Sequence, residues 1–184
     1  MTNTILELDH HISTLRPDYY PDLNSALTDE EIASLEFKYN ISLPTDLKLL
    51  YKWKNGQKEL SFDSFVNNSK FIPLDQALDT ASNNTSMIGT DFDIKNWWNE
   101  HWIPLFHNGA GDYICYDAGG LFTGEKGQLI EFWHADNDRN VIAPTLEVFL
   151  SRLNDYYTST PEDAFDEYFA VPAIKGYPKK FIAK

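Results

Sequence analysis

The spacing of apolar residues predicts a helix at the start of the chain. Over residues 4–15, apolar side chains recur at steps of three and four: Ile5, Leu8, Ile12 and Leu15. This is the period at which one face of an α-helix repeats, so the segment should bury one side against the rest of the protein. We therefore expect an amphipathic helix that ends before Pro17, because the residue before a proline avoids helical backbone angles.

A helical hairpin is predicted for residues 28–56. Thr28 followed three positions later by Glu31 forms a capping box, in which each residue satisfies a free backbone N–H at the helix start. A second helix start is indicated at Leu43-Pro44, because proline at the first helical position loses no hydrogen bond. Asn55-Gly56 supplies the left-handed stop.

Strand patterns dominate the middle of the chain. Short candidate strands are Leu60-Ser61-Phe62 and Phe71-Ile72-Pro73, and residues 75–87 are weakly helical. Longer β-rich runs, separated by glycine-containing turns, occupy residues 102–106, 112–116 and 128–133. These three runs predict an antiparallel meander.

Helices are expected again after Pro144. Apolar residues from 146 to 157 keep the helical period, and Thr160-Pro161 begins a short final helix over residues 161–170 that carries Phe165 and Phe169. The order of helices, strands and helices predicts an α+β fold: one domain over residues 1–184 with its core at about 28–157. Its mainly antiparallel mixed sheet should be covered by N-terminal and C-terminal helices.

Composition restricts the class of protein. The net charge of −13 argues against a nucleic-acid or anionic-membrane surface, and any charged partner should be basic. The single cysteine, Cys115, cannot form an internal disulfide, and the N-terminus lacks a signal-peptide pattern, so we expect a soluble cytoplasmic protein. Residues 175–184 hold four lysines and no acid, which is typical of a solubilising end.

Several stretches, in this order and spacing, resemble the SUKH superfamily, whose name derives partly from a yeast regulator of cell-wall synthesis. They are Leu43-Pro44 with Trp53-Lys54-Asn55-Gly56, then Trp102-Ile103-Pro104-Leu105-Phe106, then Asn108-Gly109-Ala110-Gly111-Asp112-Tyr113-Ile114-Cys115-Tyr116-Asp117, and Glu131-Phe132-Trp133-His134 with the helix after Ala143. The resemblance spans residues 28–153. The turn at 108–111 is one residue longer than the usual pattern of the superfamily. The resemblance does not cover the segment before Thr28 or the final helix after Tyr157.

Catalytic and metal chemistry find little support in the residues. The Gly109–Asp112 turn lacks the lysine and the helix of a phosphate-binding loop. His107, Asp112, His134, Asp136 and Asp138 have no metal-ligand spacing, and Arg139 breaks the calcium-loop pattern that begins at Asp136. Cys115 lies in an apolar run where a thiol is packed and inert. We expect no catalytic residue, metal or cofactor, although the many acids leave a glycosidase-like carboxylate pair open.

Aromatic and acidic residues provide the weak candidates for partner binding. Trp53, Trp102 and Trp133 fall at positions typical of core packing. Trp97 and Trp98 are adjacent, so in an extended segment they point to opposite sides and one of them can be a surface anchor. The acidic candidates are Asp91, Asp93, Asp136 and Asp138.

The resemblance implies a binding domain. Bacterial members of the superfamily look like immunity proteins that protect a cell from polymorphic toxins, so the leading expectation is an antitoxin that contacts its cognate toxin directly. A strongly acidic inhibitor suits a toxin with a basic cleft. Two alternatives stay open at this stage: a regulatory or scaffold domain for endogenous proteins, and a small-ligand enzyme. The sequence leaves the oligomeric state open.

Overall fold

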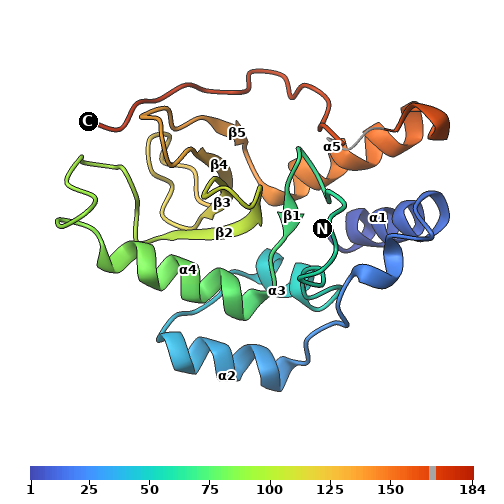
Figure 1. The fold of residues 1–184 in the computed structure, drawn as a ribbon, viewed down its shortest axis with the longest axis horizontal. Coiled ribbons are helices and arrows are strands. Elements are labelled where there is room, and N and C mark those ends of the chain that lie inside the picture. The colour runs from blue at the N-terminus through green and yellow to red at the C-terminus, as the bar shows by residue number, and fades with distance from the viewer. Residues whose placement is uncertain (166–168) are drawn as a thin grey trace.

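The computed structural model describes residues 1–165 and 169–184 and shows one five-stranded antiparallel sheet with strands in chain order (Figure 1). The strands are β1 Lys70–Phe71, β2 Trp102–His107, β3 Tyr113–Asp117, β4 Gln128–Phe132 and β5 Val141–Ala143. The α-helices are α1 Thr2–Leu15, α2 Asp29–Tyr39, α3 Thr45–Tyr51, α4 Leu74–Ser86 and α5 Leu146–Ser159, with short 3-10 helices at Tyr20–Asp22 and Glu162–Ala164. The predicted α+β fold and its antiparallel meander are confirmed.

The predicted capping box at the start of α2 is confirmed. The Thr28 hydroxyl accepts a hydrogen bond from the Glu31 backbone N–H at 3.2 Å, and the Thr28 N–H donates to the Glu31 carboxylate at 2.8 Å. Such a cap stabilises a helix by about 1 kcal/mol. The hairpin partner α3 begins one residue later than predicted, because Pro44 caps it from an extended conformation.

One face of the sheet lies under the helices and holds the main core. Helix α1 packs beside α5, as Figure 1 shows, and both bury apolar side chains toward the sheet. At the centre, the Phe106 ring on β2 lies 5.4 Å from Phe65, 5.7 Å from Phe71 and 5.9 Å from Phe149. This layer buries large aromatic rings, which contribute much of a core's stability.

The opposite face of the sheet is also buried, and it holds a second core. Its buried members are Trp98, Trp102, Cys115, Ile130, Phe132 and Val141. On β4, Leu129 belongs to the main core and Ile130 to the second, as alternation along a strand requires. In the described residues the cover here is not helical. It comes from residues 87–101, from Leu121 and Phe122 of the β3–β4 connection, and from Tyr177 and Phe181 in the later part of the C-terminal segment, residues 169–184.

The C-terminal segment is part of the fold, so its interpretation as a solubilising end is wrong. Lys179 exchanges two backbone hydrogen bonds of 2.9 Å with Val141, and the Arg139 N–H donates to the Phe181 carbonyl at 2.9 Å. The Lys184 N–H reaches the Lys95 carbonyl at 2.9 Å. The lysine ammonium groups are exposed, but the backbone pairs with the sheet and the second core.

Two predicted elements are wrong in the described residues. Leu60 and Phe62 are 82% and 85% exposed and form no strand, because Gln57 pairs with both backbone groups of Phe71 at the β1 edge and leaves no place for a further strand. The predicted helix at 161–170 is only the 3-10 turn Glu162–Ala164, which ends where Phe165 becomes extended; residues 166–168 of that prediction lie outside the described residues. The short strand β5 was not predicted.

Candidate functional site

Two loops over the second core carry all the residues that the sequence proposed for partner binding. The first loop, residues 87–101, joins α4 to β2 and holds Asp91, Asp93, Trp97 and Trp98. The second, residues 133–140, joins β4 to β5 and holds Asp136 and Asp138. We call them together the two-loop surface.

Arg139 ties the two loops together. Its side chain is fully buried, and its Nε and Nη2 donate to the Trp97 carbonyl at 3.1 and 2.9 Å. Its Nη1 donates to the carbonyls of Asp136 and Asp138 at 2.7 and 2.6 Å. The guanidinium carbon also lies 4.7 Å from the ring centres of Trp97 and Phe132. One side chain therefore fixes the position of both loops.

The electrostatics of Arg139 depend on backbone dipoles. Burial lowers the pKa of Arg139 to about 10, opposed by Cys115 and by the carboxylates of Asp136 and Asp138, so the group stays charged at neutral pH. Among the described residues no carboxylate lies within ion-pair distance of it. The residue that breaks the calcium-loop pattern thus places its own cation among the loop carbonyls. Sequence reasoning named Arg139 only as that break and missed this role.

Trp98 and Trp97 have different roles. Trp98 is 3% exposed, its Nε1 donates to the Thr85 hydroxyl at 3.3 Å, and its ring lies 5.0 Å from Phe132. It packs in the second core, so it is unavailable as a surface anchor. Trp97 is half-buried on Arg139 and keeps an accessible part. Of the adjacent pair, only Trp97 stays a candidate for partner contact.

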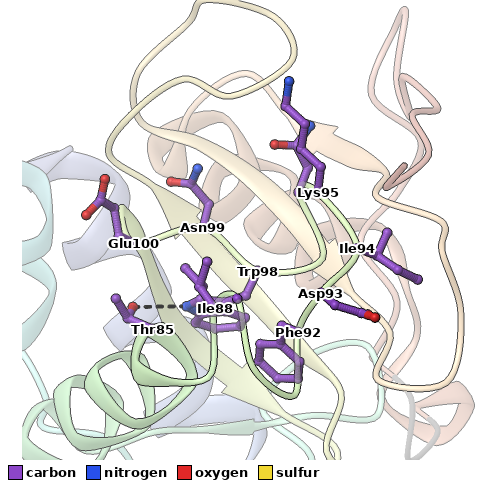
Figure 2. A pocket seen from close by; sticks show the side chains of 11 residues that line it. Thr85, Ile88, Phe92, Asp93, Ile94, Lys95, Trp98, Asn99 and Glu100 are labelled. Carbon is purple, nitrogen blue, oxygen red and sulfur yellow. Dashed lines mark hydrogen bonds between the residues drawn. The ribbon is translucent and has the colours of Figure 1, made fainter.

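A hollow of about 500 Å³ opens between the first loop and the end of α4 (Figure 2). Trp98 and Phe92 line it, while Asp93 and Ile94 lie on the outer part of the loop. Ile88 and Ile94 are 46% and 38% exposed, and all four acidic candidates are exposed. The two-loop surface therefore presents carboxylates beside apolar side chains.

A sequence model of the SMI1 / KNR4 family (SUKH-1) matches residues 26–152, which is more than half of the chain. The chain belongs to the SMI1 / KNR4 family. No curated protein matches it. This family includes immunity proteins, and its domains are generally binding domains without enzymatic activity.

The family match defines which parts of this SMI1 / KNR4 protein are additions. Both loops of the two-loop surface lie inside residues 26–152, whereas α1 and the C-terminal segment lie outside. Yet the C-terminal segment pairs with Arg139 and covers the second core. A segment beyond the matched domain thus supports a surface within it. In the described residues no helix is long and apolar enough to cross a membrane.

The polar residues around the Gly109–Asp112 turn, which the sequence raised for metal or phosphate chemistry, form structural contacts. The Asp112 carboxylate lies 2.8 Å from the His134 ring and accepts from the His134 N–H at 2.9 Å and from Asn108 at 2.8 Å. Gly111 has φ +94, and a β-carbon there would lie 3.3 Å from the His134 ring, which explains the glycine. In the described residues, no group of three His, Cys, Asp or Glu side chains could hold a metal.

Two further expectations have opposite outcomes. Cys115 is fully buried, as predicted, and burial raises the pKa of its thiol well above the ordinary value, which disfavours the nucleophilic thiolate. Trp133, however, is 39% exposed, so its assignment to the core is wrong. It directly follows Phe132, the last residue of β4, so it lies in the loop and not in the strand.

Proposed function

We propose that this protein is a cytoplasmic immunity protein that binds a toxin protein directly and neutralises it through the two-loop surface. The observation that carries the proposal is membership of a family that includes immunity proteins. Its net charge of −13 supports a partner with a basic surface, because opposite charge accelerates encounter and favours correct orientation.

The chemistry of the two-loop surface fits such a partner. Within residues 87–101 and 133–140, the exposed acids are Asp91, Asp93, Glu100, Asp136 and Asp138, against the exposed Lys95. Exposed apolar residues next to them supply area that gains from burial, while the carboxylates fix the orientation of a basic partner. Because Arg139 holds both loops, the surface is already ordered before binding, which lowers the entropic cost of association.

Co-expression tests the proposal. Production of a toxin encoded next to this protein's gene should stop growth, and co-production of this protein should restore it. The purified pair should form a stable complex by size-exclusion chromatography. If the protein protects against no neighbouring toxin and binds only endogenous housekeeping proteins, it is a regulatory or scaffold domain instead.

A charge-matched pair of variants tests the surface. Asp91→Lys/Asp93→Lys should weaken toxin binding at least about tenfold, because contacts between close opposite charges become repulsive. The control Asp18→Lys/Glu59→Lys changes two exposed acids on segments that follow α1 and α3, so it alters net charge equally away from the loops. An equal loss of affinity in both variants would mean that these acids act only through long-range electrostatic attraction. It would exclude the first loop as a contact surface.

A further inference from the structure

A second hollow lies at the other end of the 133–140 loop. It has a volume of about 300 Å³, and Glu131, Trp133 and Asp112 line it together with Asn67. A neighbouring hollow of about 240 Å³ shares Glu131 and Asn67 and is lined on one side by the C-terminal segment. Trp133 connects this region to the two-loop surface, since Arg139 also donates to the Trp133 carbonyl at 3.3 Å.

Glu131 is a poorly solvated acid without a cation. It lies on β4 opposite Ile114, and its carboxylate accepts a hydrogen bond from Asn140 at 3.0 Å. Burial raises the pKa of Glu131, against the hydrogen bonds from Asn140 and Trp133, which favour the ionised form. Among the described residues no basic side chain forms an ion pair with it. Glu131 therefore places at the hollow a carboxylate that two neutral donors contact, without a cationic partner among the described residues.

The walls of the hollow are ordered and carry complementary chemistry. Trp133 is 39% exposed and lines the hollow, and its indole N–H is hydrogen-bonded to the Glu131 carboxylate, so the ring lies next to that acid. Although burial opposes it, hydrogen bonds from His134 and Asn108 lower the pKa of Asp112 and keep a second negative charge nearby. The Asn67 side chain accepts from the Val171 N–H at 3.0 Å, so the C-terminal segment fixes this wall.

We propose that this hollow is a socket for an arginine side chain of a protein partner. A guanidinium is planar, stacks on an indole face and donates a fork of N–H groups to a carboxylate, so it matches Trp133 and Glu131 at once. A lysine ammonium supplies the charge but not the planar stacking. The inference rests on the proposed protein-binding function and deepens it, because it names the partner side chain and its position.

Titration with N-acetyl-arginine amide tests the socket in the free protein. The Trp133 indole N–H resonance, assigned by comparison with Trp133→Leu, should shift saturably in two-dimensional NMR spectra. N-acetyl-lysine amide should bind at least about fivefold more weakly, and the neutral isostere N-acetyl-citrulline amide should produce no saturable shift. Glu131→Gln keeps the size of the side chain and should weaken arginine-amide binding at least about tenfold. Its control, Glu125→Gln, changes an exposed acid on the β3–β4 connection and should bind normally.

The failures of the two proposals are distinguishable. A saturable, Glu131-dependent shift supports the socket even if no toxin is neutralised. Absence of the shift, or a shift that Glu131→Gln leaves unchanged, overturns the socket even if the protein still protects against a toxin.

Discussion

The two faces of the sheet bury aromatic side chains under very different covers. The main core lies under helices α1, α3, α4 and α5, whose apolar residues recur at a helical period. The second core lies under residues 87–101 and the later part of the C-terminal segment around Tyr177 and Phe181, which have no such period. On this second face, hydrogen bonds from Arg139 hold the covering loops in place. On the first face, the packing of helices does so.

The difference lies in how each cover of the sheet is held in place. Helices satisfy the hydrogen-bonding groups of their own backbone, so apolar contacts alone can hold them against the main core. The loops over the second core depend on Arg139 and on pairing with the C-terminal segment for their order. The residues proposed to contact a partner can lie on such loops because a few polar contacts replace regular secondary structure.

Phe106→Ala should have the largest effect on stability. Phe106 is fully buried among three other phenylalanine rings, so truncation leaves a cavity and should lower the free energy of unfolding by about 3–5 kcal/mol, measured by urea denaturation. Phe37→Ala is the control, because Phe37 is 90% exposed and its loss should change stability by less than about 0.5 kcal/mol. A loss below about 1 kcal/mol for Phe106→Ala would contradict the assignment of the main core.

Arg139→Met should separate the two faces. It removes the cation and leaves the partly buried carbonyls of Trp97, Asp136 and Asp138 without the donors that Arg139 provides, at a cost of about 2–4 kcal/mol. Hydrogen exchange should rise in residues 87–101 and 133–140 and stay nearly unchanged in α1 and α5. Uniform acceleration across all helices would mean that the two cores are one cooperative unit. Arg152→Met, on the surface of α5, is the matched control.

Phe181→Ala should weaken the C-terminal segment's hold on the second core by a smaller amount. It removes a ring whose centre lies 4.8 Å from that of Phe122, and the loss of this stacking should lower the free energy of unfolding by about 1 kcal/mol in addition to the effect of the lost apolar area. Cys115 reports the change, since it is the one cysteine of the chain and lies fully buried in the second core. Its reaction with a thiol reagent should accelerate several-fold in the native protein. An unchanged rate would show that the C-terminal segment does not restrict access to the second core.

Glu131→Gln should give the smallest effect, a gain in stability that depends on pH. Because burial raises the pKa of Glu131 above the 4.5 of an exposed glutamate, the native state binds its proton more tightly than the unfolded state. Stability due to Glu131 therefore falls as pH rises between those two values and stays reduced above them. The variant should have a higher melting temperature at pH 7 and the wild-type value below pH 4.5; equal values at both would contradict the cost of burying this charge.

Much of the regular structure could be predicted from local patterns. The capping box at Thr28 and the spacing of apolar residues fixed α1, α2 and α5, because those signals act within a few residues. Alternation and glycine turns gave β2, β3 and β4. The strand β5 was missed because Val141–Ala143 is too short to show a period.

Long-range partners explain the errors. Nothing near Leu60 in the sequence shows that Gln57 already occupies the edge of β1, and nothing near Lys179 shows that it pairs with Val141. The acidic candidates were found by charge, but the link between their loops depends on Arg139 reaching Trp97, 42 residues away. The two hollows beside Glu131 likewise join segments that are distant in the chain, so no local pattern indicates them.

The position of the C-terminal segment has a practical consequence for handling this protein. Lys184 lies against Lys95 of the first loop, so any polypeptide joined after it would emerge beside the two-loop surface proposed for partner binding. Met1 contacts Glu147 at the start of α5, on a different side of the molecule (Figure 1). Affinity tags, fluorophores and surface tethers are therefore better placed ahead of Met1, where they leave the approach of a partner unobstructed.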